Sequence, residues 1–512
     1  MTPSDALSSA AADCPRFAVV GGGISGLSAA HRLRELAPRC RLEVWEASGR
    51  LGGPLDTGSD HGFWWERGAD SFTTKLPAAR QLCERLGLDG AVLPTQPRQR
   101  RALVVCRGRL APVPEGFVLM RPQQAAGILR SSVLSVRGKL RLLCEPLVPR
   151  HAGAGLPGHD ESVASFATRR LGREAFERLV QPLLGGIYVA DASRLSLAAT
   201  MPEFLHAERD YGSLWRAPVQ ESPGVAAEAA AARANVASEP DGGAAQGARY
   251  HAFVTLKEGL SMLPAALEAA LPAGTVRRHA AVRSIERCGA GGWLLAGVDS
   301  RTRAPLDEAR YDGVVLATPA PQAAALLDKT DPQTAQLLRR IEYASSVVVN
   351  LGYEPRQFSR PLGGFGFVVP EIEGLTIVAA SFPSIKFAYR SSAELTPIRV
   401  FLGGAKQPET IAWSDARLIE AARRDLEPLV GIQGDPQTAE VARWPESMPQ
   451  YHVGHVQLVD AIEQRIGCLP RLRLAGNAYR GVGIPQCVES GWRAAEALAE
   501  AFRDGSGSGA AA

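Results

Sequence analysis

The sequence lacks the patterns that mark metalloproteins, disulfide-linked secreted proteins and membrane-spanning proteins. Its eight cysteines are scattered and none forms a C-x-x-C pair, so neither a zinc site, an iron–sulfur cluster nor a disulfide framework is indicated. No run of about 18 apolar residues occurs, so no helix is expected to span a bilayer. The formal net charge of +4 is too small to favour nucleic acid as a partner. We therefore expect reduced thiols, no metal and a cytoplasmic location.

The ends and the middle of the chain also lack structure-forming patterns. Residues 1–13 carry neither a positively charged start nor an apolar stretch, so we expect no signal peptide. Residues 217–249 are rich in Ala, Gly, Glu and Pro and contain almost no large apolar residue, which predicts a disordered surface loop. Flexible tails are expected at 1–13 and 506–512. A chain of 512 residues is too long for a single core, so two or three domains are expected.

The clearest positive pattern is a dinucleotide-binding unit near the start of the chain. The apolar run Phe17–Val20 predicts a buried strand, and apolar residues at helical spacing predict a helix from Ile24 to about Leu36. Between them, residues 21–26 have the Gly-x-Gly-x-x-Gly spacing. A second predicted strand, Arg41–Trp45, is followed at once by Glu46. A plain glycine turn is the alternative, but strand, helix, second strand and acidic end all agree with a dinucleotide site.

The glycines and the acidic residue of this unit have separate roles. Gly21 permits the tight turn, Gly23 lets the backbone approach a pyrophosphate, and Gly26 lets the helix pack close to the strand. The helix N-terminus offers free N–H groups and a positive dipole end to the phosphates. Glu46 can accept hydrogen bonds from a ribose 2′-OH, and its charge would repel a 2′-phosphate.

Two further segments are expected to contact the same cofactor. Arg50-x-Gly52-Gly53 resembles the segment of FAD-dependent oxidases that closes over the flavin diphosphate, with a solvated arginine beside a glycine turn as the alternative. Gly481-x-Gly483 precedes a predicted helix near the C-terminus. The glycine-rich stretch at Gly363 is followed by no predicted helix, so the sequence holds one dinucleotide fingerprint. A single fingerprint favours an oxidase that passes electrons to oxygen or a quinone over a nicotinamide-dependent reductase.

Each of four stretches is open to two interpretations. The segment 61–72, HGFWWERGADSF, is either a strand that delivers a backbone loop to the flavin or a hairpin that packs its tryptophans in a core. Gly185-Gly186 suits close approach to a flat ligand or a plain packing turn. The arginines at 98–101 form a solvated face, with Arg101 kept as a candidate for binding a carboxylate. Residues 112–150, basic and nearly free of acids, suit either a membrane surface or an ordinary helical cap.

Five stretches spread over nearly the whole chain carry a family resemblance. They are GGGISGL at Gly21, ERGADSF at Glu66, QPLLGGIYVADASRLSL at Gln181, MPQYHVGH at Met448 and LAGNAYRGVGIPQCVESG at Leu474. On these stretches the chain resembles the oxygen-dependent protoporphyrinogen oxidases, FAD-containing members of the amine-oxidase-like flavoprotein superfamily. GGIY and GNAYRGVGIP are quite specific within flavin oxidases, whereas the glycine fingerprint is not.

The resemblance implies an α/β fold that becomes α+β in its second domain. A Rossmann-like FAD-binding domain of the amine-oxidase/hydroxybenzoate-hydroxylase type is expected at 14–96, 250–318 and 440–505. A mixed-sheet substrate domain is expected at 97–111 and 319–439. A helical, membrane-facing domain is expected at 112–216.

The resemblance also implies the site residues, with one non-covalently bound FAD per chain. The expected FAD contacts are Gly21, Gly22, Gly23, Ile24, Ser25, Gly26, Glu46, Ala47, Arg50, Gly53, Pro54, Gly68, Ala69, Asp70, Ser71, Val282, Ala317, Trp444, Gly476, Val482, Gly483 and Ile484. The expected substrate contacts are Arg101, Gly185, Gly186 and Tyr343, together with the strand end near Ala317. Asp70 stands where some relatives have arginine, and Gln486 where aspartate is common. We nominate neither a general base nor a metal ligand.

The implied activity is oxidation of protoporphyrinogen IX to protoporphyrin IX in haem biosynthesis, with O₂ as acceptor and H₂O₂ as the second product. Hand-off of the product to a ferrochelatase, peripheral contact with the inner face of the cell membrane and a homodimer are further expectations. The alternatives are a coproporphyrinogen III oxidase of the same architecture, an amine- or carotenoid-type FAD oxidase, and a non-catalytic FAD-fold carrier that binds prenylated partners.

Overall fold

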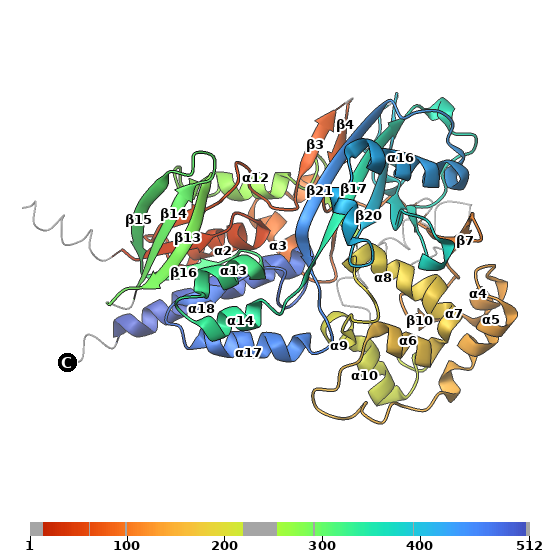
Figure 1. The fold of residues 1–512 in the computed structure, drawn as a ribbon, viewed down its shortest axis with the longest axis horizontal. Coiled ribbons are helices and arrows are strands. Elements are labelled where there is room, and N and C mark those ends of the chain that lie inside the picture. The colour runs from red at the N-terminus through yellow and green to blue at the C-terminus, as the bar shows by residue number, and fades with distance from the viewer. Residues whose placement is uncertain are drawn as a thin grey trace, which may run out of the picture.

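The computed structural model describes residues 14–60, 62–97, 100–218, 253–289, 292–392 and 394–507. The predicted tail at 1–13 lies outside these ranges, as do residues 219–249 of the predicted loop and 508–512 of the second tail. Residues 506 and 507, which we expected in that tail, instead end helix α18 (Ile484–Gly507). The predicted fold class is confirmed. Figure 1 shows the nucleotide-type sheet at one end and a large sheet with a group of helices at the other.

A five-stranded parallel sheet forms the core of the nucleotide-type end. Its order is β12 (Val276–Arg277), β2 (Arg41–Trp45), β1 (Arg16–Val20), β16 (Gly313–Leu316) and β22 (Leu472–Leu474). The strands therefore come from three segments that lie far apart in the sequence. The central strands β1 and β16 are almost entirely buried, as expected for a parallel sheet covered on both faces. Helix α2 (Ile24–Leu36) packs along α18 (Figure 1).

Smaller sheets and helices surround this core. The antiparallel sheet of β13 (Ala280–Arg287), β14 (Trp293–Asp299) and β15 (Pro305–Tyr311) lies at the far end of the molecule (Figure 1). The hairpin of β3 (Thr57–Asp60) and β4 (Phe63–Glu66) and the sheet of β5 (Phe72–Thr73), β11 (Phe253–Leu256) and β6 (Val92–Pro94) follow the nucleotide unit. The helices here are α3 (Ala78–Arg85), α12 (Met262–Ala269), α13 (Ala320–Leu327), α14 (Pro332–Leu338) and α17 (His455–Gly467).

The second large layer is a seven-stranded mixed sheet. Its order is β21 (Thr438–Pro449), β17 (Tyr343–Tyr353), β20 (Thr396–Gly403), β19 (Ala379–Ser381), β18 (Gly366–Val368), β7 (Ala102–Cys106) and β8 (Arg109–Pro112). The pair β18–β7 is parallel and the others are antiparallel. Helix α16 (Asp415–Leu426) packs its apolar face on this sheet, and the short helix α15 (Pro383–Lys386) joins β19 to β20.

Short helices with their own apolar core form the remaining part. They are α4 (Ala125–Arg130), α5 (Val136–Leu143), α6 (Val163–Leu171), α7 (Arg173–Ala175), α8 (Gln181–Tyr188), α9 (Leu197–Thr200) and α10 (Pro202–Tyr211). The sequence also predicts a single helix from Glu161 to Val180, and this prediction is wrong. Gly172 adopts φ +92°, which L side chains rarely adopt, and it divides α6 from α7 and the π-helical turn η3 (Phe176–Val180).

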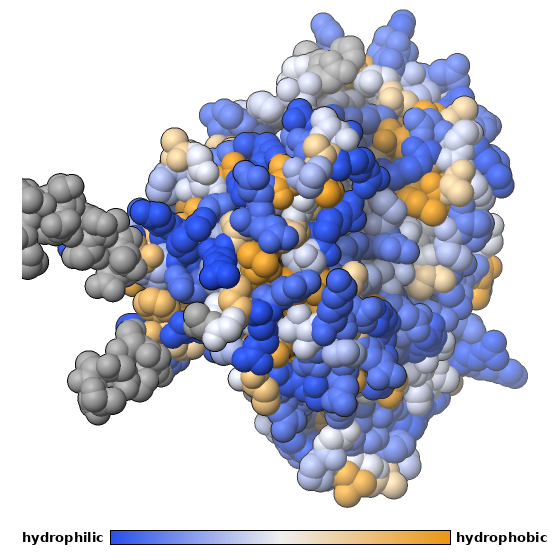
Figure 2. Space-filling model, turned by 60° about the vertical axis from the view of Figure 1, so that its left-hand side comes forward, coloured by the Kyte–Doolittle hydropathy of each residue, from blue (hydrophilic) through white to orange (hydrophobic). Residues whose placement is uncertain are grey.

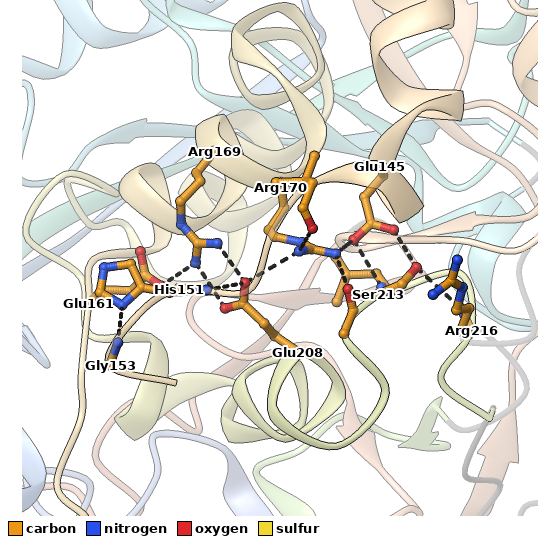
Figure 3. A network of polar contacts seen from close by, with 12 residues as sticks. Glu145, His151, Gly153, Glu161, Arg169, Arg170, Glu208, Ser213 and Arg216 are labelled. Atoms are coloured by element: carbon orange, nitrogen blue, oxygen red, sulfur yellow. Dashed lines mark hydrogen bonds and ion pairs between the residues drawn. The ribbon is translucent and has the colours of Figure 1, made fainter. Parts of the chain in front are cut away.

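Buried ion pairs hold these helices together (Figure 3). Arg170 of α6, Glu145 and Glu208 of α10 have side chains that are 0% exposed. The Arg170 guanidinium pairs with Glu145 and, at 3.4 Å, with Glu208. The neighbouring Arg169 donates to both carboxylate oxygens of Glu208, at 2.6 and 2.9 Å, and Ser213 Oγ donates to Glu145 at 2.6 Å. Two adjacent arginines therefore join α6, α10 and the turn at Glu145.

One surface of this helical part is apolar and basic. Leu129, Val136, Leu140 and Leu147 are 55, 73, 57 and 79% exposed. Among the described residues, no helix is long and apolar enough to cross a membrane. Figure 2 shows the face seen when the nucleotide-type end of Figure 1 comes forward, and this face is mainly hydrophilic, with hydrophobic side chains in separate groups.

Candidate FAD and substrate site

The loop of residues 21–26 joins β1 to α2 and forms an open cradle. Gly21 adopts φ +109°, and its N–H donates to the Trp45 carbonyl at 2.8 Å. A Cβ on Gly21 would lie 2.6 Å from the Ala317 carbonyl oxygen, and one on Gly26 would collide with the Gly21 carbonyl. A Cβ on Gly23 would meet nothing within 4 Å. The protein's own packing therefore requires Gly21 and Gly26, whereas Gly23 leaves free space at the N-terminus of α2.

Glu46 closes the other side of this cradle. Its carboxylate accepts the N–H groups of Gly22 and Ser48, both at 2.7 Å. The strand β13 begins beside it, because the Ala280 N–H donates to the Glu46 carbonyl at 2.8 Å. This pairing brings Glu46 and the exposed Ala47 near the start of the strand that carries Val282. Val282 packs against a buried apolar cluster, so its predicted contact with an adenine stays a prediction.

The segment from Arg50 to Pro54 folds back over the glycine loop. The Gly52 N–H donates to the Gly22 carbonyl at 2.8 Å, and a Cβ on Gly53 would lie 3.7 Å from the Gly23 Cα. Arg50 donates to the Gly53 carbonyl at 2.8 Å. Its guanidinium also lies 6.0 Å from the Trp444 ring. Predicted cofactor residues from three parts of the sequence are thus brought together around one open space.

The loop of residues 68–71 lies against the segment from Arg50 to Pro54. Gly68 packs against the Pro54 carbonyl, and a Cβ on Gly68 would collide with it. The Ala69 N–H donates to that carbonyl at 3.3 Å. Trp444 Nε1 donates to the Arg67 carbonyl at 2.7 Å, which places the indole against Gly68. Pro54, Gly68, Ala69 and Trp444 therefore pack together, and their contact with the cofactor stays a prediction.

Asp70 forms ion pairs with two cations that the sequence analysis did not predict. Lys386 Nζ lies 2.9 Å from Asp70 Oδ1, and Arg399 Nη1 lies 3.0 Å from Oδ2. Ser71 Oγ donates to the same carboxylate at 2.7 Å. Burial alone would raise the pKa of Asp70, but the charges of Lys386 and Arg399 outweigh it and hold the pKa far below its usual range. Arg399, on β20 of the mixed sheet, also donates to the Gly68 carbonyl and so bonds the loop to the sheet.

Glu66 is a buried carboxyl two positions before this loop. Burial raises the pKa of Glu66 to about 7, although Thr57 and Arg390 favour its charged form. Its oxygens accept from Thr57 Oγ1 at 2.8 Å and from the Leu260 N–H at 2.9 Å. The residue is 3% exposed, which is too enclosed for contact with a substrate. We therefore assign it to the support of the loop.

The C-terminal turn supplies a second helix N-terminus to the same space. Gly476 and Gly481 adopt φ +138° and +142°, and α18 begins at Ile484. The Gly476 N–H donates to Ser490 Oγ at 3.0 Å. Ile484 shares an apolar cluster with Ile24, the first residue of α2. The predicted cofactor contacts at Gly476, Val482, Gly483 and Ile484 thus lie at the start of a helix packed on α2.

The residues predicted to contact the substrate lie on the mixed sheet and beside it. Gly185 and Gly186 form no turn, because both lie inside α8, and that prediction is wrong. A Cβ on Gly186 would lie 3.6 Å from Val368 of β18 and 3.9 Å from Ala379 of β19, which are ordinary van der Waals distances. A Cβ on Gly185 would meet only the Gln181 side chain, at 4.0 Å. The pair therefore lies on a helix beside β18 and β19, and the packing requires neither glycine.

Tyr343 and Arg101 occupy different ends of this region. Tyr343 Oη accepts the Ala320 N–H at 2.9 Å, just after the strand end near Ala317, and burial raises the pKa of Tyr343 to about 12. Arg101 is exposed and precedes β7, with its carbonyl accepting the Phe365 N–H at 3.0 Å. Arg101 lies three positions before Val104, which pairs with Val368 of β18. Arg101 is therefore about 10 Å along the strand from that pair.

The cradle fits an FAD on physical grounds. Free space at Gly23, two helix N-termini and the Glu46 carboxylate suit a diphosphate flanked by a ribose. The surface of Pro54, Gly68 and Trp444 continues from that point and suits a flat ring system. Backbone N–H groups would hold the diphosphate, and this surface would hold the flavin.

Comparison with known proteins agrees with this fit. The family model described as flavin containing amine oxidoreductase matches residues 24–499. The coproporphyrinogen III oxidase of Bacillus subtilis is 30% identical, covering 92% of this chain and 95% of its own length. That of Propionibacterium freudenreichii is 32% identical, covering 94% and 90%. The protoporphyrinogen oxidase 2 of Arabidopsis thaliana is 28% identical, covering 94% and 93%.

Solved structures share the fold over the whole chain. A crystal structure from Exiguobacterium sp., provisionally assigned as a protoporphyrinogen oxidase, superposes with a TM-score of 0.79 at 28% identity, covering 95% of this chain and 99% of its own. Cyclohexylamine oxidase from Brevibacterium oxydans superposes with a TM-score of 0.64 at 16% identity, covering 96% and 100%, and shows the fold alone. The chain belongs to the family of flavin-containing amine oxidoreductases, and its cofactor is FAD.

Proposed function

We propose that this chain oxidises a porphyrinogen to the corresponding porphyrin, with O₂ as the electron acceptor. The observation that carries the proposal is similarity over nearly the full length to porphyrinogen oxidases, at 30 and 32% identity for two bacterial relatives. The site supports it, because Gly186 of α8 lies beside Val368 and Ala379 of the mixed sheet, and all three residues are small and apolar. A flat macrocycle needs such a wall.

The reaction balances as one porphyrinogen and three O₂ giving one porphyrin and three H₂O₂. A bound FAD would supply the redox chemistry, taking up a hydride equivalent from the macrocycle in each of three rounds and returning the electrons to O₂. The chain's own residues bind and orient the macrocycle and exclude water from it. Gly186, Val368 and Ala379 supply the apolar wall, and Arg101 pairs with a propionate at the rim. None of the predicted site residues is assigned as a general base.

The sequence predicts protoporphyrinogen IX as the substrate, and coproporphyrinogen III is the second candidate. The names of the bacterial relatives at 30 to 33% identity favour the second, and those of the two plant relatives at 28 and 29% favour the first. Turnover of each porphyrinogen under air, followed by porphyrin fluorescence and by H₂O₂ release, decides between them. Absence of turnover with both would overturn the proposal. Turnover that needs a quinone would correct the acceptor.

Arg101→Ala is expected to raise KM for the porphyrinogen about tenfold or more, with kcat within about twofold. A hydrogen bond between charged groups contributes about 1.5–3 kcal/mol, and this contact is made equally before and during reaction. Steady-state kinetics by porphyrin fluorescence measures both constants. Arg109→Ala, on the next strand and equally exposed, is the control and should leave KM unchanged. An unchanged KM for Arg101→Ala would remove this residue from the substrate site.

We also propose a peripheral membrane contact through the exposed residues Leu129, Val136, Leu140 and Leu147. Arg130 and Arg137, both exposed, flank these side chains and favour anionic lipid headgroups. Val136→Glu with Leu140→Glu is expected to lower co-sedimentation with phosphatidylglycerol vesicles at least tenfold. The control places the same two charges at Ile372 and Tyr389, 48 and 67% exposed on the mixed-sheet part, and should leave binding unchanged. No vesicle binding by the parent protein would refute the contact. The ferrochelatase hand-off and the homodimer stay predictions.

A further inference from the structure

The hydroxyl of Tyr451 bonds to both ends of the C-terminal turn. Tyr451 follows β21 and is 2% exposed. Its Oη donates to the Asn477 carbonyl at 2.5 Å and accepts the Gly481 N–H at 2.8 Å. These two groups bracket residues 477–481, which connect Gly476 to the start of α18. One phenolic oxygen thus closes the segment that leads into the predicted flavin contacts.

His455 adds a third bond to the same turn. Its ring stacks on Tyr451, with centroids 3.9 Å apart and planes 13° apart, and its Nε2 lies 3.0 Å from the Tyr479 carbonyl. A carbonyl oxygen only accepts, so Nε2 carries the hydrogen in the neutral ring. Burial lowers the pKa of His455 to about 4, so the ring is neutral near pH 7. The two stacked side chains therefore bond to backbone groups at three alternate positions of one turn.

This turn needs such support because of its glycines. Gly476 and Gly481 adopt backbone angles that L side chains rarely adopt, and glycine has the largest conformational freedom to lose on ordering. The turn itself forms neither helix nor strand. Side-chain bonds to 477, 479 and 481 replace the bonds that regular structure would have made. They fix the N–H groups at 482–484 in one place.

The other side of Tyr451 is fastened to the helical part. The Tyr451 carbonyl accepts the Ser196 N–H at 2.7 Å, and the Gly454 N–H donates to Asp160 Oδ2 at 3.0 Å. Val482 packs against the same apolar cluster that contains Tyr451. The Tyr451–His455 segment is therefore bonded to the helical part on one side and to residues 477–481 on the other.

We propose that Tyr451 is a positioning residue for the flavin, which acts with His455 by holding residues 477–481 so that the N-terminus of α18 stays aimed at the FAD. The inference rests on the flavin part of the proposed function and not on the identity of the substrate. Tyr451 itself makes no contact with the reacting atoms in this assignment. It acts through the turn.

Tyr451→Phe keeps the ring and its stack and removes only the hydroxyl. We expect the Kd for FAD to rise about tenfold and the FAD dissociation rate to rise in proportion, measured by recovery of free-flavin fluorescence. The midpoint potential of the bound flavin should also shift, because its backbone donors are no longer fixed. The unfolding midpoint of the apoprotein should change little. None of these measurements uses a porphyrinogen, so they stay valid if the substrate proposal fails.

Three further variants separate positioning from general stability. Tyr353→Phe removes a buried hydroxyl from β17, where it makes no hydrogen bond to the turn, and should leave FAD binding unchanged. His455→Leu should weaken FAD binding about as much as Tyr451→Phe, whereas His455→Gln, which keeps a donor, should restore most of it. Unchanged FAD affinity and dissociation rate in Tyr451→Phe would overturn the inference. An equal loss in Tyr353→Phe would overturn it as well.

Discussion

Gly23→Asp is expected to raise the Kd for FAD at least a hundredfold. The new carboxylate occupies the free space at the N-terminus of α2, where the diphosphate must lie. Two like unit charges about 4 Å apart repel by about 4 kcal/mol at an effective dielectric constant of about 20. The free energy of unfolding of the apoprotein should change by no more than about 1 kcal/mol, because Asp is a favoured N-cap residue. Quenching of flavin fluorescence during titration measures Kd.

Gly23→Asn is the matched control for this variant. It has nearly the same size and the same capping ability but no charge, so it should weaken FAD binding much less than Gly23→Asp does. Chemical denaturation of both apoproteins checks that the fold is intact. A Gly23→Asp protein that purifies yellow with the parent's Kd would show that the diphosphate lies elsewhere.

Arg170→Met is expected to lower the free energy of unfolding of the helical part by about 3–5 kcal/mol. The substitution keeps an apolar stem in place of the arginine stem but leaves Glu145 and Glu208 buried with one cation fewer, and breaking a buried ion pair from one side costs about that much. Hydrogen exchange of the peptides that span α6 and α10 measures the loss locally. Adding Glu145→Gln should recover part of it.

Arg173→Met is the control for the buried arginine. Arg173 lies three positions further on, and its side chain is 82% exposed where it pairs with Glu177. Exposed pairs contribute about 0–1 kcal/mol, so this variant should exchange like the parent. Equal protection in Arg170→Met would mean that the apolar core alone holds these helices.

Local patterns were sufficient to predict the nucleotide unit. The helix Ile24–Leu36 and the strand Arg41–Trp45 have the predicted bounds, and Glu46 closes the cradle as its place after the strand predicts. Strand alternation, helical spacing and the glycine interval are all contained within about thirty residues, which is the scale at which sequence patterns predict structure. The family resemblance supplied the rest of the cofactor site.

Local sequence patterns did not predict the contacts between segments that lie far apart in the chain. Lys386 lies 316 positions from Asp70, and nothing in either neighbourhood indicates the pair. For Gly185–Gly186 the sequence left a packing turn and close approach to a flat ligand open, and the structure places both glycines inside α8. The helix expected from Glu161 to Val180 failed at Gly172, where a left-handed residue interrupts a helical apolar pattern.

The order of strands in the parallel sheet sets when the cofactor can bind during synthesis. The ribosome releases β1 and α2 first, but β16 waits for residue 316 and β22 for residue 474. Only after α18 emerges is the apolar face of α2 covered and the second helix N-terminus present. A chain that ends before residue 470 lacks both β22 and α18, and we expect it to bind no FAD.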